Sequence, residues 1–386
     1  MKLKIGIIGT RGIPNNYGGF EQITEFVSLG LTRLGHRVTV YNSHNHPYKQ
    51  NEWNGVSIVH CYDPEYYLST AGQFIYDFNC LRDARQRNFD VILIMGYSSS
   101  SVWKKVFPKQ SMIIYNMDGL EWKRSKYSKP VQKFLKYAEN LAVKCCNFHI
   151  ADSKAIRDYL KKEYNINCNY IPYGAELNRL EVEGVLTKYQ LLRDQYFLLI
   201  ARMEPENNIA LILETFTKTS TEKKFVVVGN TQTLHGKYLT KKFGKDKRIQ
   251  FTGPLFNQDI LHTLRKNANL YFHGHSVGGT NPSLLEAMAS KSVIIAHDNA
   301  FNKSILSEDA LYFLTANDII QIINSDISPR HKTRMIENNF RKIEEEFTWD
   351  KVVQQYHELI CSCYASQKSQ NLVRLKELIG QQVSVE

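Results

Sequence analysis

The sequence predicts an α/β protein built from two doubly wound domains that face each other across a cleft. The chain has 386 residues, more than a single hydrophobic core normally holds, so two domains are expected. In both halves, short apolar runs rich in β-branched residues alternate with helical patterns, which is typical of parallel sheets with crossover helices. A break containing proline and glycine, residues 171–176, separates the halves, and we place the domain boundary there.

The first half alternates regularly between expected strands and helices. Strands are expected at Leu3–Gly9, Arg37–Asn42, Val56–Cys61, Val91–Met95, Met112–Asn116, Phe148–Ala151 and Asn169–Pro172. Helices are expected at Phe20–Leu34, Gly72–Arg87, Ser99–Val106, Lys129–Cys146 and Ser153–Tyr164. Ser153 is typical of an N-cap, because its hydroxyl can accept a hydrogen bond from the first helical turn.

The second half repeats this alternation. Its strands are expected at Phe197–Ala201, Lys224–Val228, Ile249–Phe251, Leu270–Phe272, Ser292–Ala296 and Ala310–Phe313. Its helices are expected at Asn208–Thr217, Gln258–Lys266, Asn281–Ser290, Ala316–Asn324 and Pro329–Glu346, and a helical tail runs from Trp349 to about Ile379. We therefore assign residues 1–175 to the first domain, 176–350 to the second and 351–386 to a C-terminal helix.

Composition narrows the class of protein. No apolar stretch approaches the roughly 20 residues that a membrane-spanning helix needs, and the apolar run after Met1 is too short for a signal peptide. The seven cysteines include no C-x-x-C pair, so neither a zinc site nor a disulfide framework is indicated. We expect reduced thiols in a cytoplasmic protein.

The net charge is +11, and a basic protein favours an anionic partner. Residues 103–146 concentrate this charge, with ten Lys/Arg against three acids. The segment is either a solvated face or a surface for anionic membrane at the inner face of the plasma membrane. Nucleic-acid binding would explain the charge but none of the loops described next.

Doubly wound domains bind ligands at the carboxyl ends of their strands, so the loops after strands are the candidate sites. The loop after the first strand, residues 9–21, contains Arg11 and ends with Gly18-Gly19 at the start of a helix. Bare amides at a helix N-terminus can receive an anion, and Arg11 adds a positive charge. The alternative is a flexible glycine-rich turn without a ligand.

Two loops of the second domain have the same character. Arg202, at the end of its first strand, could bind a diphosphate with two parallel hydrogen bonds, or it could pair with Glu204 or Glu206. Residues 273–289 form a second glycine-rich loop that opens a helix, and the amides of residues 278–281 could cradle phosphate or sugar oxygens. An unpaired Glu286 in that apolar helix would be costly, and a ribose diol would satisfy it.

A fourth loop, residues 116–124, supplies the carboxylates Asp118 and Glu121 after a strand of the first domain. They either stabilise the loop or act on a substrate. Paired carboxylates alone would indicate a glycosidase, but the anion-receptive loops favour a nucleotide donor. His273 and His275 share one face of a strand, and without nearby acids or cysteines a hydrogen-bonding role is favoured over a metal.

These loops resemble those of family 4 glycosyltransferases, retaining enzymes with the GT-B fold of two Rossmann-like domains. Residues 281–289, Asn-Pro-Ser-Leu-Leu-Glu-Ala-Met-Ala, are similar to the second half of the family's paired-glutamate motif. Residues 9–21, 118–124 and 275–282 resemble a subgroup that includes bacterial rhamnosyltransferases of capsule and cell-wall polysaccharide synthesis. Phe347-Thr348-Trp349-Asp350 is similar to the family's C-terminal segment, after which the last helix crosses back to the first domain.

Three positions depart from the family pattern. Gly278 stands where the first glutamate of the motif is expected, Asn207 stands where the diphosphate-binding lysine is expected, and Asp118 matches the pocket histidine. Because the subgroup shares these changes, the resemblance implies a variant site that remains active.

The hypothesis is a retaining transferase that moves a sugar, L-rhamnose first, from a dTDP- or UDP-sugar to a glycan or a lipid-diphosphate-linked acceptor, without a metal or other cofactor. The expected catalytic residues are Asp118, Glu121, Arg202 and Glu286. The expected substrate-binding residues are Arg11, Gly18, Gly19, Asn207, Gly229, Phe256, His275, Gly278, Gly279, Thr280 and Asn281. The alternatives are a non-catalytic nucleotide-sugar-binding protein and an NAD-dependent enzyme, although no ribose-binding acid follows the second strand.

Overall fold

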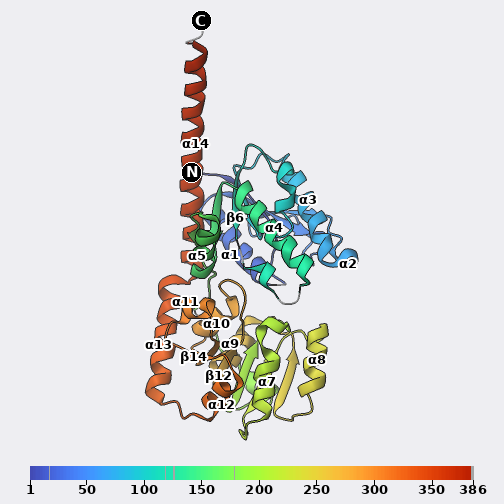
Figure 1. Cartoon of the computed structure of the whole chain (residues 1–386), viewed down its shortest axis with the longest axis vertical. Helices are drawn as coiled ribbons and strands as arrows, with labels where there is room; N and C mark the ends of the chain where they lie inside the picture. Colours follow the sequence, from blue (N-terminus) through green and yellow to red (C-terminus); the bar gives the residue numbers. More distant parts are fainter. Residues whose placement is uncertain (17, 118, 125–126, 178, 384–386) are drawn as a thin grey trace.

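The computed structural model describes residues 1–16, 18–117, 119–124, 127–177 and 179–383, with side chains up to Ser369. It contains two separate sheets, each covered by helices (Figure 1). Strands of the first sheet come from residues 4–170, and those of the second come from residues 196–313. The molecule therefore has two Rossmann-like α/β domains.

The first domain has eight strands in the order β3-β4-β2-β1-β5-β6-β7-β8. All neighbouring pairs are parallel except β3 with β4. The strands are β1 (Lys4–Ile8), β2 (Arg37–Ser43), β3 (Glu52–Trp53), β4 (Val56–Cys61), β5 (Val91–Met95), β6 (Met112–Asn116), β7 (Phe148–Ala151) and β8 (Asn169–Tyr170). The helices are α1 (Gly19–Arg33), α2 (Glu65–Leu68), η1 (Ser69–Ala71), α3 (Gly72–Ala84), η2 (Ser101–Val106), η3 (Glu121–Lys123), α4 (Lys129–Cys145) and α5 (Lys154–Tyr164).

The second domain has six parallel strands in the order β11-β10-β9-β12-β13-β14. They are β9 (Tyr196–Ile200), β10 (Lys224–Val228), β11 (Ile249–Gly253), β12 (Leu270–His273), β13 (Ile294–His297) and β14 (Leu311–Phe313). The helices are α6 (Val185–Lys188), η4 (Pro205–Asn207), α7 (Ile209–Thr217), α8 (Leu234–Phe243), α9 (Gln258–Asn267), α10 (Pro282–Ala289), α11 (Ala300–Leu306), α12 (Ala316–Asn324) and α13 (Pro329–Glu346).

The central strands of both sheets are buried on both faces. Every residue of β5 and β6 is buried, which is why these strands are continuous apolar runs without alternation. In the second domain, Phe197, Phe225 and Phe272 come from three adjacent strands and pack edge to face, with ring centroids 5.0–6.0 Å apart. This packing fixes the positions of the strand ends, and therefore of the loops that follow them.

The strand order reverses beside β1 in the first sheet and beside β9 in the second. At such a point the crossover helices leave to opposite faces of the sheet, and the loops after the two central strands open a crevice between them. Loop 9–18 follows β1, and Arg202 lies just after β9. The fold therefore places two of the predicted loops at the ligand-binding edges of their sheets.

The chain crosses between the domains twice, and the two crossings lie side by side. The amide of Ala175 donates a hydrogen bond of 2.7 Å to the carbonyl of Phe347, and Ala175 also forms an isolated parallel bridge with Thr348. A methyl group on Gly174 would lie 2.6 Å from Cδ2 of Trp349, so only glycine allows the crossings to approach this closely.

After the second crossing, α14 (Trp349–Val383) packs on α1 of the first domain. Trp349 stacks on Phe26 with ring centroids 4.2 Å apart, and Tyr356 is fully buried. Figure 1 shows that the C-terminal part of α14 extends beyond the first domain. Within the described residues, no helix has the length and apolar content that crossing a bilayer requires.

The structure adds elements that the sequence pattern did not predict and changes one. The added elements are β3, α2, η1, η3, α6, η4, α8 and α11. Helix α8 was missed because it buries only three of its ten residues, which leaves little apolar periodicity to detect. The helix expected at 99–106 is a 3-10 segment, Ser101–Val106, interrupted by non-helical backbone at Trp103.

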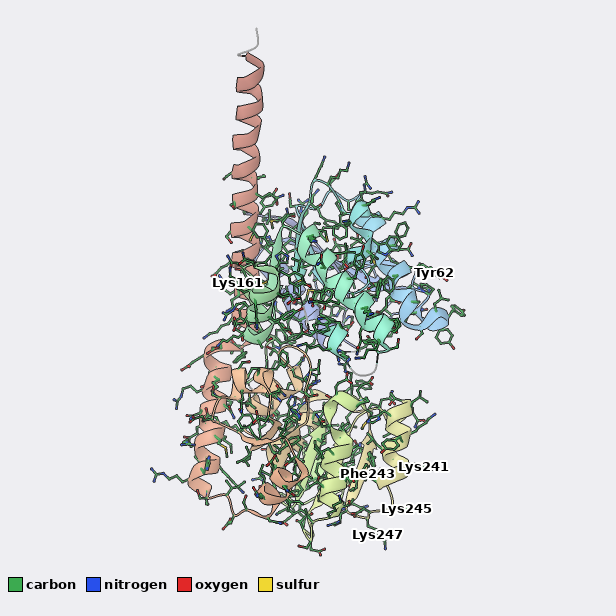
Figure 2. The ribbon with its side chains drawn as sticks, in the orientation of Figure 1. Tyr62, Lys161, Lys241, Phe243, Lys245 and Lys247 are labelled. Atoms are coloured by element: carbon green, nitrogen blue, oxygen red, sulfur yellow. The ribbon has the colours of Figure 1, made fainter. Side chains whose placement is uncertain are left out.

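Positive charge is not confined to one region. Figure 2 shows Lys241, Lys245 and Lys247 at the end of the second domain that is remote from the first. These side chains are exposed, and they are far from the strand ends where the domains meet. The net charge alone therefore does not locate a binding surface.

Candidate functional site

Two helix N-termini, one from each domain, meet at the domain boundary. Gly18 is the N-cap of α1, and no side chain caps this helix end. A methyl group on Gly19 would lie 3.4 Å from Cγ of Pro282, the first residue of α10. Asn281 caps α10 by accepting a hydrogen bond of 2.9 Å from the Ser283 amide. The positive ends of both helices therefore converge on one place.

Arg202 follows β9 and lies near this point. Among the described residues, its guanidinium has no hydrogen-bond or ion-pair partner. Burial lowers the pKa of His275 well below its usual value, and the charges of His273, Arg124 and Arg202 lower it further. Arg202 is therefore close to the loop that precedes α10, in position to bind an anion there.

Glu206, which the sequence offered as a partner for Arg202, pairs with the other domain instead. Its Oε1 lies 3.1 Å from Nη1 of Arg124, and both side chains are at least nine-tenths buried. Nη2 of Arg124 also lies 2.6 Å from Oε1 of Glu121. Arg124 thus bridges a carboxylate of each domain, and the alternative in which Glu206 pairs with Arg202 is wrong.

Asn207 is held on both sides by the protein. Its Oδ1 is 2.9 Å from Nδ1 of His275, and its Nδ2 donates a hydrogen bond of 2.7 Å to the carbonyl of Arg202. The residue is 5% exposed. In this arrangement Asn207 fixes the shape of the loop that carries Arg202, and both ends of its amide are occupied.

The loop before α10 explains why glycine replaces glutamate at 278. Gly278 has φ +140°, and a Cβ atom there would lie 2.7 Å from Nε2 of His275. Gly279 leaves no room for a Cβ either, because the carboxylate of Asp152 fills that space. Thr280 is buried and donates a hydrogen bond from Oγ1 to the carbonyl of Asp152. The second domain therefore contacts the first through these backbone positions.

Asp152 is a site residue that the sequence analysis treated only as the neighbour of an N-cap. It follows β7 directly and is fully buried at the domain boundary. A carboxylate placed right after a parallel strand was the available signal. The contact with Gly279 shows that Asp152 faces the loop before α10.

In the loop after β6, Asp118 lies outside the described residues. Glu121 accepts a hydrogen bond of 2.7 Å from Nε of Arg124, so its carboxylate is oriented by an arginine. A methyl group on Gly119 would lie 3.9 Å from Cα of Gly278. This loop therefore reaches the same place as the loop before α10.

Beneath loop 119–124, the carboxylate of Glu139 collects donors from several elements. Glu139 is 1% exposed. Its donors are Tyr97 Oη (3.3 Å), Trp122 Nε1 (3.2 Å), Lys136 Nζ (2.9 Å), Tyr159 Oη (2.7 Å) and Tyr164 Oη (2.6 Å). Tyr97 also donates to the carbonyl of Gly119 at 3.2 Å. The network fixes the loop that carries Glu121 and Arg124.

Glu286 is paired, contrary to the premise that only a ligand would satisfy it. Its Oε2 lies 2.5 Å from Nη2 of Arg265, whose side chain is 2% exposed. Its Oε1 accepts a hydrogen bond of 3.1 Å from Nε2 of Gln22, on α1 of the other domain. Glu286 therefore already has partners in both domains, although its side chain is still 15% exposed.

Three other predicted residues lie outside this convergence. Arg11 forms a two-point ion pair with Glu65 of α2, at 3.0 and 2.5 Å, so its charge is neutralised within the first domain. Gly229 follows β10 and packs against Met203. Phe256 follows β11 and is 71% exposed. Gly229 thus lies against the loop that carries Arg202.

Comparisons with known proteins agree with this architecture. Residues 2–176 match the family described as "Domain of unknown function (DUF1972)", and residues 188–340 match "Glycosyl transferases group 1". The alpha-1,3/1,6-mannosyltransferase ALG2 of Candida glabrata is 26% identical over 240 residues, which cover 55% of this chain and 51% of that protein. The match thus spans about half the length of this relative.

Solved structures resemble the chain over nearly its full length. Sucrose-phosphate synthase from Thermosynechococcus elongatus has a TM-score of 0.77 at 15% identity, covering 95% of this chain and 100% of that one. Anabaena HepE in complex with UDP-glucose has a TM-score of 0.69 at 16% identity, covering 93% and 100%. A glycosyltransferase from Rickettsia africae has a TM-score of 0.69 at 15% identity, covering 94% and 98%.

The class of protein follows from the two facing domains and these likenesses: the chain has the GT-B fold, as predicted from its sequence. More particularly, residues 188–340 of its second domain match the group 1 glycosyltransferase family.

Proposed function

We propose that the protein transfers a glycosyl unit from a nucleoside diphosphate sugar to an acceptor hydroxyl at the domain boundary. The observation that carries the proposal is the meeting of two helix N-termini from opposite domains beside Arg202. A methyl group added at Gly19 would be within van der Waals distance of Pro282 there. An anion with two phosphates suits two positive helix ends and one guanidinium.

Breaking the bond between the sugar and the diphosphate leaves growing negative charge on the phosphate oxygens. Preorganised donors stabilise such charge without reorganising during the reaction. The amides of Gly18 and Gly19, the amides of residues 279–281 and the guanidinium of Arg202 would supply them. Because these groups are cationic or are hydrogen-bond donors, we expect transfer without added Mg²⁺ or Mn²⁺.

The rest of the donor would lie along the second domain. Glu286 is partly exposed beside α1 and would accept hydrogen bonds from the ribose hydroxyls. Gly229 and Phe256 would contact the base. Anabaena HepE was solved with UDP-glucose, which supports UDP-sugars, together with dTDP-sugars, as the first donors to test.

The acceptor would bind on the first domain, near Asp118 and Glu121. The resemblance to rhamnosyltransferases supports L-rhamnose as the transferred sugar, retention of configuration and a role in cell-surface polysaccharide synthesis. The Candida glabrata relative is named as a mannosyltransferase, so GDP-mannose belongs in the same donor panel.

A donor panel tests the proposal directly. Thermal unfolding is measured with dTDP-, UDP- and GDP-sugars, because a ligand that binds the native state raises the melting temperature. Transfer and hydrolysis are then assayed with the donor that binds.

Arg202→Ala should weaken donor binding and lower turnover at least tenfold, whereas the exposed Arg330→Ala should change neither. Equal turnover in both variants would remove the diphosphate site from this position, and binding without turnover would favour a non-catalytic nucleotide-sugar-binding protein.

The first domain also presents a face suited to a membrane-bound acceptor. We call it the aromatic-basic face; it consists of the exposed residues Tyr66, Tyr67, Leu68, Ile75, Lys129, Val131, Lys133, Phe134 and Tyr137. Phe74 of α3 and Phe134 of α4 have ring centroids 5.6 Å apart, which joins the helices of this face. Apolar side chains mixed with lysines favour the headgroup region of an anionic bilayer, and we propose peripheral binding there.

A further inference from the structure

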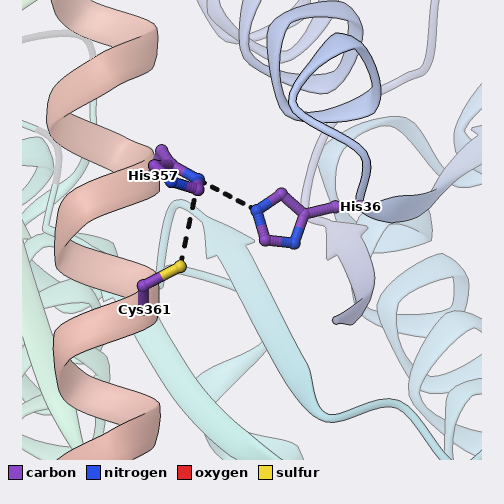
Figure 3. A group of neighbouring side chains, drawn as sticks. All are labelled: His36, His357 and Cys361. Atoms are coloured by element: carbon purple, nitrogen blue, oxygen red, sulfur yellow. Dashed lines mark hydrogen bonds between the residues drawn. The ribbon is translucent and has the colours of Figure 1, made fainter. Parts of the chain in front are cut away.

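Three potential metal ligands converge where α14 packs on the first domain (Figure 3). His36 lies between α1 and β2, whereas His357 and Cys361 lie on α14. Nε2 of His36 is 2.9 Å from Nδ1 of His357, and Sγ of Cys361 is 3.9 Å from the same Nδ1. Ligand atoms of all three lie within 4.8 Å of one another.

The arrangement is built into the helix packing. His357 and Cys361 are four residues apart, so they share one face of α14. That face is held against the first domain by the stack of Trp349 on Phe26 and by the buried Tyr356. His36 is 4% exposed, and the two helix residues are half-buried. Over the described residues, no other set of three His, Cys, Asp or Glu side chains meets the same distance criterion.

The hydrogen bonds among the three residues do not satisfy every donor. The Leu3 amide donates to Nδ1 of His36 at 3.2 Å, so the proton of this imidazole is on Nε2 and is donated to His357. Nδ1 of His357 has one lone pair, and the thiol of Cys361 faces the same atom. Two donors therefore compete for one acceptor, whereas a cation would accept electron pairs from all three residues.

We propose that His36, His357 and Cys361 bind one zinc ion that clamps α14 to the first domain. Typical Zn–N and Zn–S bonds of about 2.0–2.1 and 2.3 Å place tetrahedral ligand atoms about 3.4–3.6 Å apart. The observed separations of 2.9 and 3.9 Å bracket that range, and the ligand atoms of His36 and Cys361 lie within 4.8 Å of each other. Side-chain shifts of up to about 1 Å therefore complete the site. Water would occupy the fourth position.

Binding has a defined proton balance. The thiol of Cys361 loses its proton to solvent and binds as thiolate. The imidazole of His36 binds through Nε2, so its proton moves to Nδ1 and the hydrogen bond from Leu3 is given up. His357 binds through Nδ1 and keeps its proton on Nε2. One proton is therefore released for each zinc ion bound.

The clamp is independent of the glycosyl-transfer proposal, because its residues lie away from the strand ends that form the candidate active site. Its effect would be structural: it would hold α14 against α1 and so keep the C-terminal helix packed on the first domain. Loss of donor binding would not contradict the clamp, and loss of metal binding would not contradict the transferase.

Cobalt titration of the chelator-treated full chain tests the site. Co²⁺ replaces Zn²⁺ in sites of this type, and a thiolate ligand gives a charge-transfer absorption band. One equivalent should produce that band in the unmodified protein and in the matched control Cys168→Ser, which removes a partly buried thiol elsewhere. Cys361→Ser should lose the band. A band that survives in Cys361→Ser, or no saturable band in the unmodified protein, would overturn the assignment.

Zinc titration by calorimetry provides a second readout that does not depend on folding of the cysteine variant. The enthalpy of zinc binding is measured in two buffers of different ionisation enthalpy, and the difference gives the number of protons released. The unmodified protein should release one proton per zinc ion. His357→Gln should weaken binding at least tenfold, as expected when one of three protein ligands is lost, whereas the exposed His331→Gln should leave it unchanged. Equal affinity in the two variants would contradict the proposal.

Discussion

At the scale of residues, one side chain, Glu286, has both a structural role and a proposed binding role. It neutralises Arg265, which is nearly inaccessible to water, and we propose that it also binds the donor. Removing one partner of a buried ion pair costs about 3–5 kcal/mol, because the other charge stays buried without compensation. Alanine substitution at 286 would therefore confound loss of a ligand with loss of stability.

We predict that Glu286→Ala and Glu286→Gln separate these effects. The alanine variant should melt several degrees lower, because Arg265 loses its counterion. The glutamine variant retains a hydrogen-bond acceptor for Arg265, so it should lose less stability but still bind the donor at least tenfold more weakly. Calorimetry and donor titration provide the measurements, with the exposed Glu344→Gln as control. Equal melting temperatures in the Ala and Gln variants would argue against the ion pair.

Asn207 and Gly278 show why part of the site could not be derived from residue types alone. The family pattern places a lysine and a glutamate there, but the structure fills both places with packing around His275. The residues that create this constraint lie far apart in the sequence, so no local sequence pattern reveals it. Arg202 was predictable because it lies just after β9, and the two helix N-termini were predictable because a glycine-rich loop leads from a strand to each of them.

Asn207→Lys should therefore fail to rebuild a two-cation clamp. The substitution breaks hydrogen bonds to His275 and Arg202 and places an ammonium in a buried position beside a guanidinium. We expect a loss of about 1–3 kcal/mol and a melting temperature lowered by several degrees, with no gain in donor affinity. Thermal unfolding and donor titration measure both, and the exposed Lys218→Asn serves as a surface control. Tighter donor binding in Asn207→Lys would contradict this account.

Asp77 gives a pH dependence that can be measured. Burial raises its pKa to about 7, while a hydrogen bond from Ser99 opposes the shift. The folded state therefore holds the proton more tightly than the unfolded state, and stability falls as the pH rises from about 4 through 7. Relative to the natural chain, Asp77→Asn should be more stable at pH 8 than at pH 5, by about 1.4 kcal/mol for each pH unit between pH 5 and the folded-state pKa of about 7.

Urea unfolding at the two pH values checks this prediction. The exposed Asp326→Asn is the control, and it should show the same stability difference at both pH values. If Asp77→Asn follows the control, the buried carboxyl does not carry the predicted shift.

At the scale of elements, the strands were predicted more reliably than the short helices. The central strands of both sheets are buried apolar runs, which burial on two faces requires. Helix α11 has only seven residues and begins at an N-cap, Asn299, whose side chain accepts a hydrogen bond from Asn302. Its sequence is too short to show a helical period, so its cap and its packing define it.

The contact between α1 and α14 depends on a glycine. A methyl group on Gly30 would lie 2.6 Å from Cγ2 of Val353. We predict that Gly30→Ala lowers stability by about 1–3 kcal/mol through overpacking, although alanine favours a helix by up to about 1 kcal/mol. Urea unfolding measures the change.

A double-mutant cycle isolates this contact. Val353→Ala should create a small cavity by itself but relieve the clash when it is combined with Gly30→Ala. The double variant should then be more stable than the sum of the single changes predicts. Additive effects would show that the two helices do not meet at these residues.

At the scale of the whole molecule, the aromatic-basic face predicts selective binding to anionic vesicles. Each lysine near such a surface contributes about 1 kcal/mol, and salt screens that contribution. Lys129→Gln/Lys133→Gln should reduce binding to phosphatidylglycerol vesicles about tenfold at low salt, and Tyr66→Ser/Tyr67→Ser should reduce the part that persists in salt. Vesicle sedimentation measures both.

The matched control is Lys241→Gln/Lys245→Gln, which removes the same charge from the remote end of the second domain (Figure 2). It should bind vesicles like the natural chain. If Lys241→Gln/Lys245→Gln loses as much binding as Lys129→Gln/Lys133→Gln, the attraction reflects net charge and not this face. If phosphatidylcholine vesicles bind as well as anionic ones, the lysines do not select the surface.

The paired crossings at Ala175 and Phe347 set how the domains can move. Two chain segments joined by a backbone hydrogen bond act as a single line of attachment, so relative motion reduces to rotation about an axis through that line. Displacement then grows with distance from the axis, and parts of the boundary near residues 174–175 and 347–349 barely move. The ion pair of Arg124 with Glu206 also joins the two domains, but it is not part of these chain crossings. The distance between its two side chains would therefore report how far the domains have rotated apart.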